Sequence, residues 1–157
     1  MQDNAITEVT RRNIIDALRV GNWSWCGRLD EAEFLSRLFD LECLPSYDPR
    51  YKTMSEDIWK HRVANPEDWP DDWVYSDGRL DLLGGPDEAF LRFLCEMVHP
   101  LVRNKDEDVD ELVALFNRYL SADGYQLSVV DAISGRRLFA ATRTLAGADA
   151  SVGTRAR

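Results

Sequence analysis

Residues 106–142 read DEDVDELVALFNRYLSADGYQLSVVDAISGRRLFAAT. Apolar residues recur at helical spacing up to Leu120, and Asp123-Gly124 ends that pattern. From Tyr125 onward apolar and polar residues alternate as they do in a strand, and a turn around Ser134-Gly135 interrupts the alternation. The stretch therefore predicts a helix followed by a β-hairpin. Because an isolated hairpin is only marginally stable, we expect it to pack on the helices or to add to another sheet.

The residues before this stretch predict four more helices. They are expected over about 7–19, from Asp30 to a point before Pro45, from Thr53 or Ser55 to about Val63, and from Gly85-Pro86 to His99-Pro100. Asp30 and Glu33 are spaced as a capping box. We expect Val9 and Trp59 to point inward and a left-handed Gly21 to stop the first helix. The predicted fold class is α+β, predominantly α-helical, with about five helices and a C-terminal β-hairpin.

Length and terminal composition predict the domain organisation. A chain of 157 residues favours one domain, which we place at residues 1–143. Residues 144–157 lose the apolar periodicity and predict a disordered tail or linker remnant. The sequence has no apolar run near the roughly 20 residues of a membrane helix and no signal-peptide pattern at its start, so a cytoplasmic location is expected.

The charge balance limits the class of partner. With 28 acidic and 19 basic residues the formal net charge is −9, which repels polyanions. Generic duplex DNA is therefore disfavoured as a partner, because such binding depends on neutralising phosphates. The same charge leaves open a minor alternative, an acidic mimic of nucleic acid. Most basic residues are arginines, whose planar fork suits carboxylates, phosphates and protein interfaces.

Motifs for metal or cofactor chemistry are weak. The three cysteines form no CxxC pair, and the two histidines, His61 and His99, are each alone in their segment. Residues 65–86 form an acidic, aromatic loop in which Trp69 and Trp73 are expected at the edge of the core. The spacing of its aspartates does not match that of an EF-hand calcium loop. These aspartates are Asp68, Asp71, Asp72, Asp77 and Asp81. We predict no metal site and no cofactor.

One helical pair could carry phosphodiester chemistry. Arg92 and His99 are seven residues apart on a predicted helix, which places them close to one face. The pair resembles the R-x(4 to 6)-H signature of HEPN ribonucleases, although Phe93 stands where those enzymes usually carry a polar residue. A structural alternative is that Arg92 forms a surface ion pair and His99 caps the end of its own helix, where its positive charge would suit the dipole.

Three runs, residues 25–41, 90–100 and 123–136, carry a wider resemblance. In this order they resemble the N-terminal domain of AbiJ-type abortive infection proteins, in particular its third subtype, over about residues 5–140. The resemblance implies a module of bacterial antiphage systems that senses or regulates, usually placed before an effector such as a HEPN-type ribonuclease. The expected partners are such an effector protein or a phage-derived ligand.

The resemblance supplies no catalytic residues, but candidate binding residues lie in its runs or directly beside them. These are Trp23, Trp25, Arg28, Arg37, Arg136 and Arg137. Core packing is an alternative for the tryptophans, and helix capping and ion pairing are alternatives for Asp30 and Arg28. The predicted function is a non-enzymatic sensor or regulatory interaction module. The alternative is a metal-independent endoribonuclease that uses Arg92 and His99.

Overall fold

The computed structural model of the chain describes residues 4–144 and confirms the predicted fold class. The helices are α1 (Glu8–Val20), α2 (Glu31–Ser36), α3 (Met54–Ile58), α4 (Asp87–Met97) and α5 (Asp106–Leu120). The strands β1 (Tyr125–Ile133) and β2 (Arg136–Arg143) form one antiparallel hairpin. Short turns of other helix types are the π-helical η1 (Trp59–Val63) and the 3₁₀ turns η2 (Trp73–Tyr75) and η3 (Ser121–Asp123).

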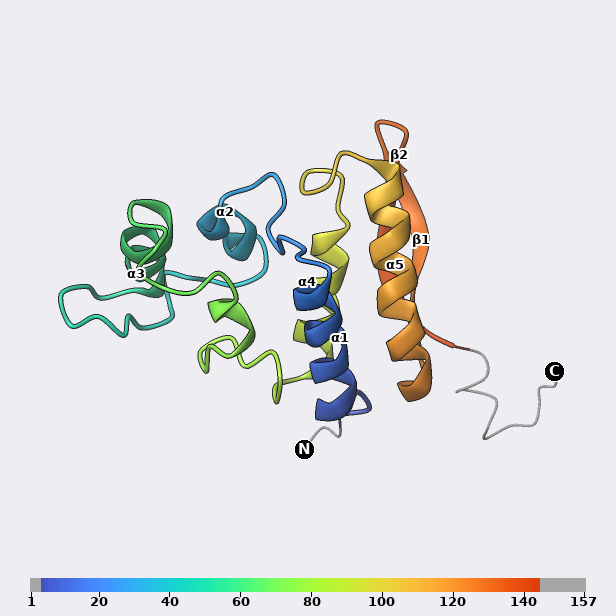
Figure 1. Cartoon of the computed structure of the whole chain (residues 1–157), viewed down its shortest axis with the longest axis horizontal. Helices are drawn as coiled ribbons and strands as arrows, with labels where there is room; N and C mark the ends of the chain where they lie inside the picture. The colour runs from blue at the N-terminus through green and yellow to red at the C-terminus, as the bar shows by residue number, and fades with distance from the viewer. Residues whose placement is uncertain (1–3, 145–157) are drawn as a thin grey trace.

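The long helices form the centre of the molecule. Figure 1 shows α1, α4 and α5 lying next to one another, with the hairpin beside α5 at one end and α2 and α3 at the other. The contacts follow this order, because α5 packs on α1 and β1, and α4 packs on β2. Phe90 and Phe93 of α4 and Phe116 of α5 are almost fully buried, and the Phe93 ring packs against Phe34 of α2.

The hairpin packs on the helices, as predicted. Leu127 of β1 is buried, and the side-chain amide of Asn117 on α5 bonds both the N–H and the carbonyl of Leu127 at 2.7 and 3.2 Å. Ser134 and Gly135 connect the strands with φ of 52° and 77°. Two successive left-handed residues are typical of a type I′ hairpin turn, whose twist matches that of the strands.

Two capping boxes start the short helices. The Asp30 carboxylate accepts the backbone N–H of Glu33, and the Glu33 carboxylate accepts that of Asp30, at 2.7 and 3.1 Å. The predicted capping box is therefore confirmed. As predicted, α2 ends before Pro45, and its last residue is Ser36. Thr53 and Glu56 form a second box at the start of α3.

Three local predictions are wrong. Gly21 has a φ of −78°, so it is right-handed, and Asn22 takes the left-handed conformation instead. Val9 is 68% exposed because it lies on the solvent face of α1. Trp59 is 59% exposed because α3 continues there as the π-helical turn η1, whose wider turn shifts the apolar face.

A buried ion pair joins α1 to the start of α4. The Arg11 guanidinium lies 2.9 Å from the Asp87 carboxylate, and both residues are buried. Asp87 also accepts hydrogen bonds from the backbone N–H groups of Ala5 and Ile6. Besides complementing the dipole of α4, this carboxylate therefore binds the segment before α1. The pair fixes the segment before α1 onto α4.

The predicted tail starts too early by at least one residue. Thr144 donates its backbone N–H to the Gly124 carbonyl at 2.9 Å, so the ordered domain includes it. The rest of the predicted tail, residues 145–157, lies outside the described residues. Among the described helices, none is long and apolar enough to cross a membrane.

Candidate functional site

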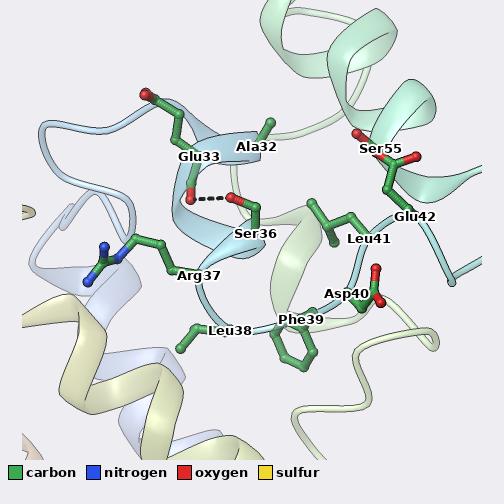
Figure 2. A pocket seen from close by; sticks show the side chains of 10 residues that line it. All are labelled: Ala32, Glu33, Ser36, Arg37, Leu38, Phe39, Asp40, Leu41, Glu42 and Ser55. Carbon is green, nitrogen blue, oxygen red and sulfur yellow. Dashed lines mark hydrogen bonds between the residues drawn. The ribbon is translucent and has the colours of Figure 1, made fainter.

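A wide surface hollow lies beside α2, and we call it the α2 groove. Its volume is about 640 Å³, within the usual range for ligand sites. Figure 2 shows its lining, which comes from α2, the segment after it and the start of α3: Ala32, Glu33, Ser36, Arg37, Leu38, Phe39, Asp40, Leu41, Glu42 and Ser55. The groove is thus an open, mixed apolar and charged surface.

The early end of α2 creates this groove. The backbone N–H groups of Leu38 and Phe39 both bond the Leu35 carbonyl, so the chain turns tightly away after α2. The Ser36 hydroxyl donates to the Glu33 carbonyl at 2.9 Å, the bond drawn in Figure 2. Leu38, Phe39 and Leu41 then supply apolar surface beside the charged side chains.

Arg37 links the α2 groove to the end of α4. Its guanidinium forms an ion pair with Glu96, and its Nη2 lies 3.5 Å from Nε2 of His99. Nδ1 of His99 accepts the backbone N–H of Leu101 at 3.0 Å. Burial lowers the pKa of His99, which favours the neutral ring. The expectation of a positively charged His99 that complements the helix dipole is therefore wrong.

Arg92 lies in different surroundings from His99. It lines a second cavity of about 390 Å³ between α4 and the hairpin, together with Leu91, Tyr125 and Phe139. Within residues 4–144, no hydrogen bond or ion pair joins Arg92 to His99, whose side-chain contacts are with Arg37 and the Leu101 backbone. The described structure thus places the two ribonuclease candidates in separate surroundings.

The two candidate tryptophans differ in burial. Trp25 is 3% exposed, its ring packs against Phe34 and Phe93, and its indole N–H donates to the Asp71 carbonyl at 3.1 Å. Its place in the structure is that of a core residue. Trp23 is half-buried, and the guanidinium of Arg103 lies 5.7 Å from its ring centroid. Of the two, only Trp23 presents a surface to a partner.

The other candidate arginines are spread over the molecule. Arg28 is exposed in the loop before α2, and its backbone N–H bonds the Val102 carbonyl. Arg136 and Arg137 form ion pairs with Asp106 and Asp110 of α5 at 3.4 and 2.8 Å. These two arginines hold the hairpin against the acidic start of α5. The described structure therefore does not gather the six candidates into one site.

Three aspartates of the loop pair with arginines, two of which come from elsewhere in the fold. Asp71 pairs with Arg62, Asp72 with Arg19, and Asp77 with Arg79. This pairing explains how a segment so rich in acids stays folded.

His61 is not alone, contrary to the sequence interpretation. Its ring nitrogens lie 2.8 Å from the Asp48 carboxylate and 2.9 Å from that of Asp68, and Asp57 lies 3.7 Å away. Among the described residues, Asp48, Asp57 and His61 form a group that could hold a metal ion. The sequence contained one signal for it, the spacing of four residues between Asp57 and His61, which places two possible ligands on one helix face.

Comparison with known families identifies the domain. A family model described as AbiJ N-terminal domain 3 matches residues 5–141. The chain belongs to this family. The match spans α1 to most of β2, so the AbiJ N-terminal domain comprises both the helical body and the hairpin. Membership gives the chain an abortive-infection, antiphage setting and confirms the resemblance seen in the sequence. No significant match was found among curated proteins or solved structures.

Proposed function

We propose that the chain is a non-enzymatic sensor and regulatory module of an abortive-infection system, and that the α2 groove is its recognition surface. The observation that carries this proposal is the groove itself, a hollow of ligand-site size with Arg37 in its lining, in an AbiJ N-terminal domain. The partners that fit are a phage-derived ligand or an effector protein such as a HEPN-type ribonuclease.

The chemistry of the groove supports a ligand that carries an anionic group. Arg37 is its basic side chain, and 36% of that side chain is exposed. A guanidinium binds carboxylates and phosphates in a bidentate manner. Glu33, Asp40 and Glu42 also line the groove, so a polyanion would be repelled while one well-placed anionic group could be accepted.

The contacts of Arg37 also offer a way to transmit binding. Arg37 is shared between the groove and the end of α4, where it contacts Glu96 and His99. A ligand that engages Arg37 competes with Glu96 for the same guanidinium. The ligand would therefore bind more tightly to an arrangement of α2 and α4 without the Arg37–Glu96 ion pair than to one that keeps it. A ligand shifts a conformational equilibrium only through such a difference in affinity.

The separate surroundings of Arg92 and His99 favour regulation over catalysis. General acid–base chemistry requires both groups within reach of one substrate. In this structure Arg92 faces the cavity by the hairpin, whereas His99 faces Arg37. The endoribonuclease alternative therefore needs a rearrangement or a second copy of the chain to bring the two residues together.

A phage challenge tests the proposal. Bacteria would carry the chain in its native genetic setting as the wild type, as Arg37→Ala or as Ser36→Trp, which fills the groove. Both changes alter the α2 groove, and we expect each to lower the protection against phage at least tenfold. Arg12→Ala, which removes an exposed arginine of α1 that does not line the groove, is the control and should protect like the wild type.

Thermal melting of the purified variants separates loss of function from loss of folding. A groove variant counts only if its melting temperature stays close to that of the wild type. Full protection by both folded groove variants would overturn the role of the groove. Loss of protection in Arg12→Ala would also contradict it, because a change outside the groove would then have the same effect as a change within it.

A further inference from the structure

The surroundings of His61 form a compact cluster between three segments. His61 lies on η1, Asp57 at the end of α3, Asp48 in the connection between α2 and α3, and Asp68 in the acidic loop. One ligand atom from each of Asp48, Asp57 and His61 lies within 4.8 Å of the others. Nε2 of His61 is 2.8 Å from Oδ2 of Asp48 and 3.7 Å from Oδ1 of Asp57. These three atoms face one another.

Asp57 contributes an observation of its own. Its side chain is fully buried, and its Oδ2 accepts the Tyr47 backbone N–H and the Arg79 guanidinium at 3.0 and 2.9 Å. Its Oδ1, which faces His61, has no hydrogen-bond partner among the described residues. Buried carboxylate oxygens are normally satisfied, since an unpaired one loses its hydration without compensation. The orphan oxygen therefore indicates a ligand in the cluster.

The orientation of His61 fits a metal ligand. Its Nδ1 lies 2.9 Å from Oδ2 of Asp68, and its ring stacks on Trp69 with a centroid distance of 5.1 Å and an interplanar angle of 19°. A histidine that donates one ring N–H to a carboxylate presents the lone pair of its other nitrogen to a metal. Asp68 and Trp69 thus hold Nε2 toward Asp48 and Asp57.

We propose that Asp48, Asp57 and His61 bind a divalent transition-metal cation of the zinc class, with Asp68 orienting the histidine. One imidazole nitrogen with two carboxylates is a zinc-type donor set, whereas Ca²⁺ and Mg²⁺ prefer oxygen ligands alone. Three protein ligands leave a further position for water or a group of a bound partner. The cation would join the connection between α2 and α3 to η1. It would also give Oδ1 of Asp57 the partner that this oxygen lacks among the described residues.

The neighbouring arginines are compatible with a bound cation. Arg50 pairs with Asp48 at 2.7 Å, but its side chain is 63% exposed, so it can move away from the cluster. Arg79 uses only Oδ2 of Asp57 and leaves Oδ1 available. Since a carboxylate oxygen has two lone pairs, both aspartates can keep an arginine while they bind a metal.

Zinc titration of the tag-free, chelator-treated full chain by isothermal calorimetry tests the site. We expect one Zn²⁺ per chain in the wild type and no such binding in His61→Gln. Asp68→Asn should weaken binding about 10- to 100-fold, because carboxylates that hydrogen-bond a metal-bound histidine have effects of that size. His99→Gln changes the other histidine of the chain and should bind like the wild type. Mg²⁺ at the same concentration should give no binding.

Asp48→Asn provides a second test if His61→Gln does not fold. Asp48 lies at the border of the cluster, and its replacement keeps the shape of the side chain, so the folded variant should lose equimolar zinc binding. The absence of equimolar zinc binding in the wild type would overturn the proposal. The contacts between His61 and the carboxylates would then be hydrogen bonds only. Zinc binding that survives in both His61→Gln and Asp48→Asn would also overturn it.

Discussion

At the scale of single residues, the fold depends most on buried charges that are fully paired. Arg11 donates to the Ile6 and Leu82 carbonyls as well as to Asp87, so its guanidinium is satisfied within the core. Removing one partner of such a pair leaves the other charge buried and uncompensated, which is far more costly than losing a surface pair. The adjacent residues Arg11 and Arg12 allow the stability contributions of a buried and an exposed ion pair to be compared.

Arg11→Ala should lower the free energy of unfolding by about 3–5 kcal/mol, because Asp87 would remain buried without its partner. The adjacent Arg12 pairs with Glu8, and both of these side chains are 58% exposed. Arg12→Ala should therefore change the free energy by less than about 0.5 kcal/mol. Urea unfolding of both variants measures the difference. Equal effects of the two substitutions would contradict the buried pairing.

His99 should make the protein less stable in mild acid. Burial holds the pKa of His99 below its ordinary value, so the unfolded chain takes up a proton at this group more readily than the folded one. The stability contribution of the neutral ring is present above the ordinary histidine pKa and is lost as the pH falls. Arg37 disfavours the charged ring as well, while Glu96 favours it.

The measurement is the melting temperature of the wild type and of His99→Gln at pH 7.5 and pH 5.5. The wild type should lose stability relative to the variant on going to pH 5.5. His61 is present in both proteins, so its titration cancels in the comparison. If the melting temperature of the wild type instead rose relative to that of His99→Gln at pH 5.5, the lowered pKa of His99 would be contradicted.

At the scale of elements, the helices that were predicted best are those with local signals. Asp30 with Glu33 is visible in the sequence as a capping box, and the box forms in the structure. The change from helical spacing to alternation after Gly124 likewise predicted the hairpin. The end of α2 at Ser36 and the π-helical turn η1 could not be predicted, because no local residue pattern marks either of them.

Asp30→Ala should lower the free energy of unfolding by about 1 kcal/mol through the loss of the cap of α2. The helix has six residues, so few other backbone bonds support its start. Arg28→Ala, two residues earlier and exposed, is the matched control and should be neutral. Chemical denaturation of both variants decides the matter, and an unchanged midpoint for Asp30→Ala would show that the capping box contributes nothing.

Gly135→Ala should destabilise the hairpin by about 1 kcal/mol. A Cβ at this position would meet no atom within 4 Å, so the effect comes only from the left-handed backbone, with φ of 77°. Ser134→Asn should be neutral or slightly stabilising, because asparagine favours the first position of a type I′ turn. Thermal unfolding of the two variants compares them directly. A Gly135→Ala variant as stable as the wild type would contradict the turn type.

At the scale of the whole molecule, paired charges explain how a strongly acidic chain folds. The formal net charge is −9, yet Asp71 and Asp72 of the acidic loop meet Arg62 and Arg19 from other segments, and Asp77 meets Arg79 of the loop itself. These long-range pairs were not predictable from the sequence, which showed the loop with a single base of its own. These three aspartates are therefore engaged in ion pairs within the fold.

The candidate sites were predicted less completely than the fold. Arg37 was named from the sequence, and the structure places it on the α2 groove. Trp25 was named for the same reason as Trp23, a tryptophan in a loop, but the structure buries it. Arg92 and His99 share a spacing on one helix, but α4 ends at Met97, so the spacing does not place His99 beside Arg92. Long-range packing decides all three outcomes.

The most direct test of the regulatory role is total RNA integrity and cell growth on expression of the chain, as the wild type, as His99→Ala and as Arg92→Ala. We predict intact RNA and unchanged growth in all three strains, as the proposed regulatory role requires. RNA cleavage and toxicity in the wild type, abolished by His99→Ala and Arg92→Ala, would contradict that role and establish the endoribonuclease alternative.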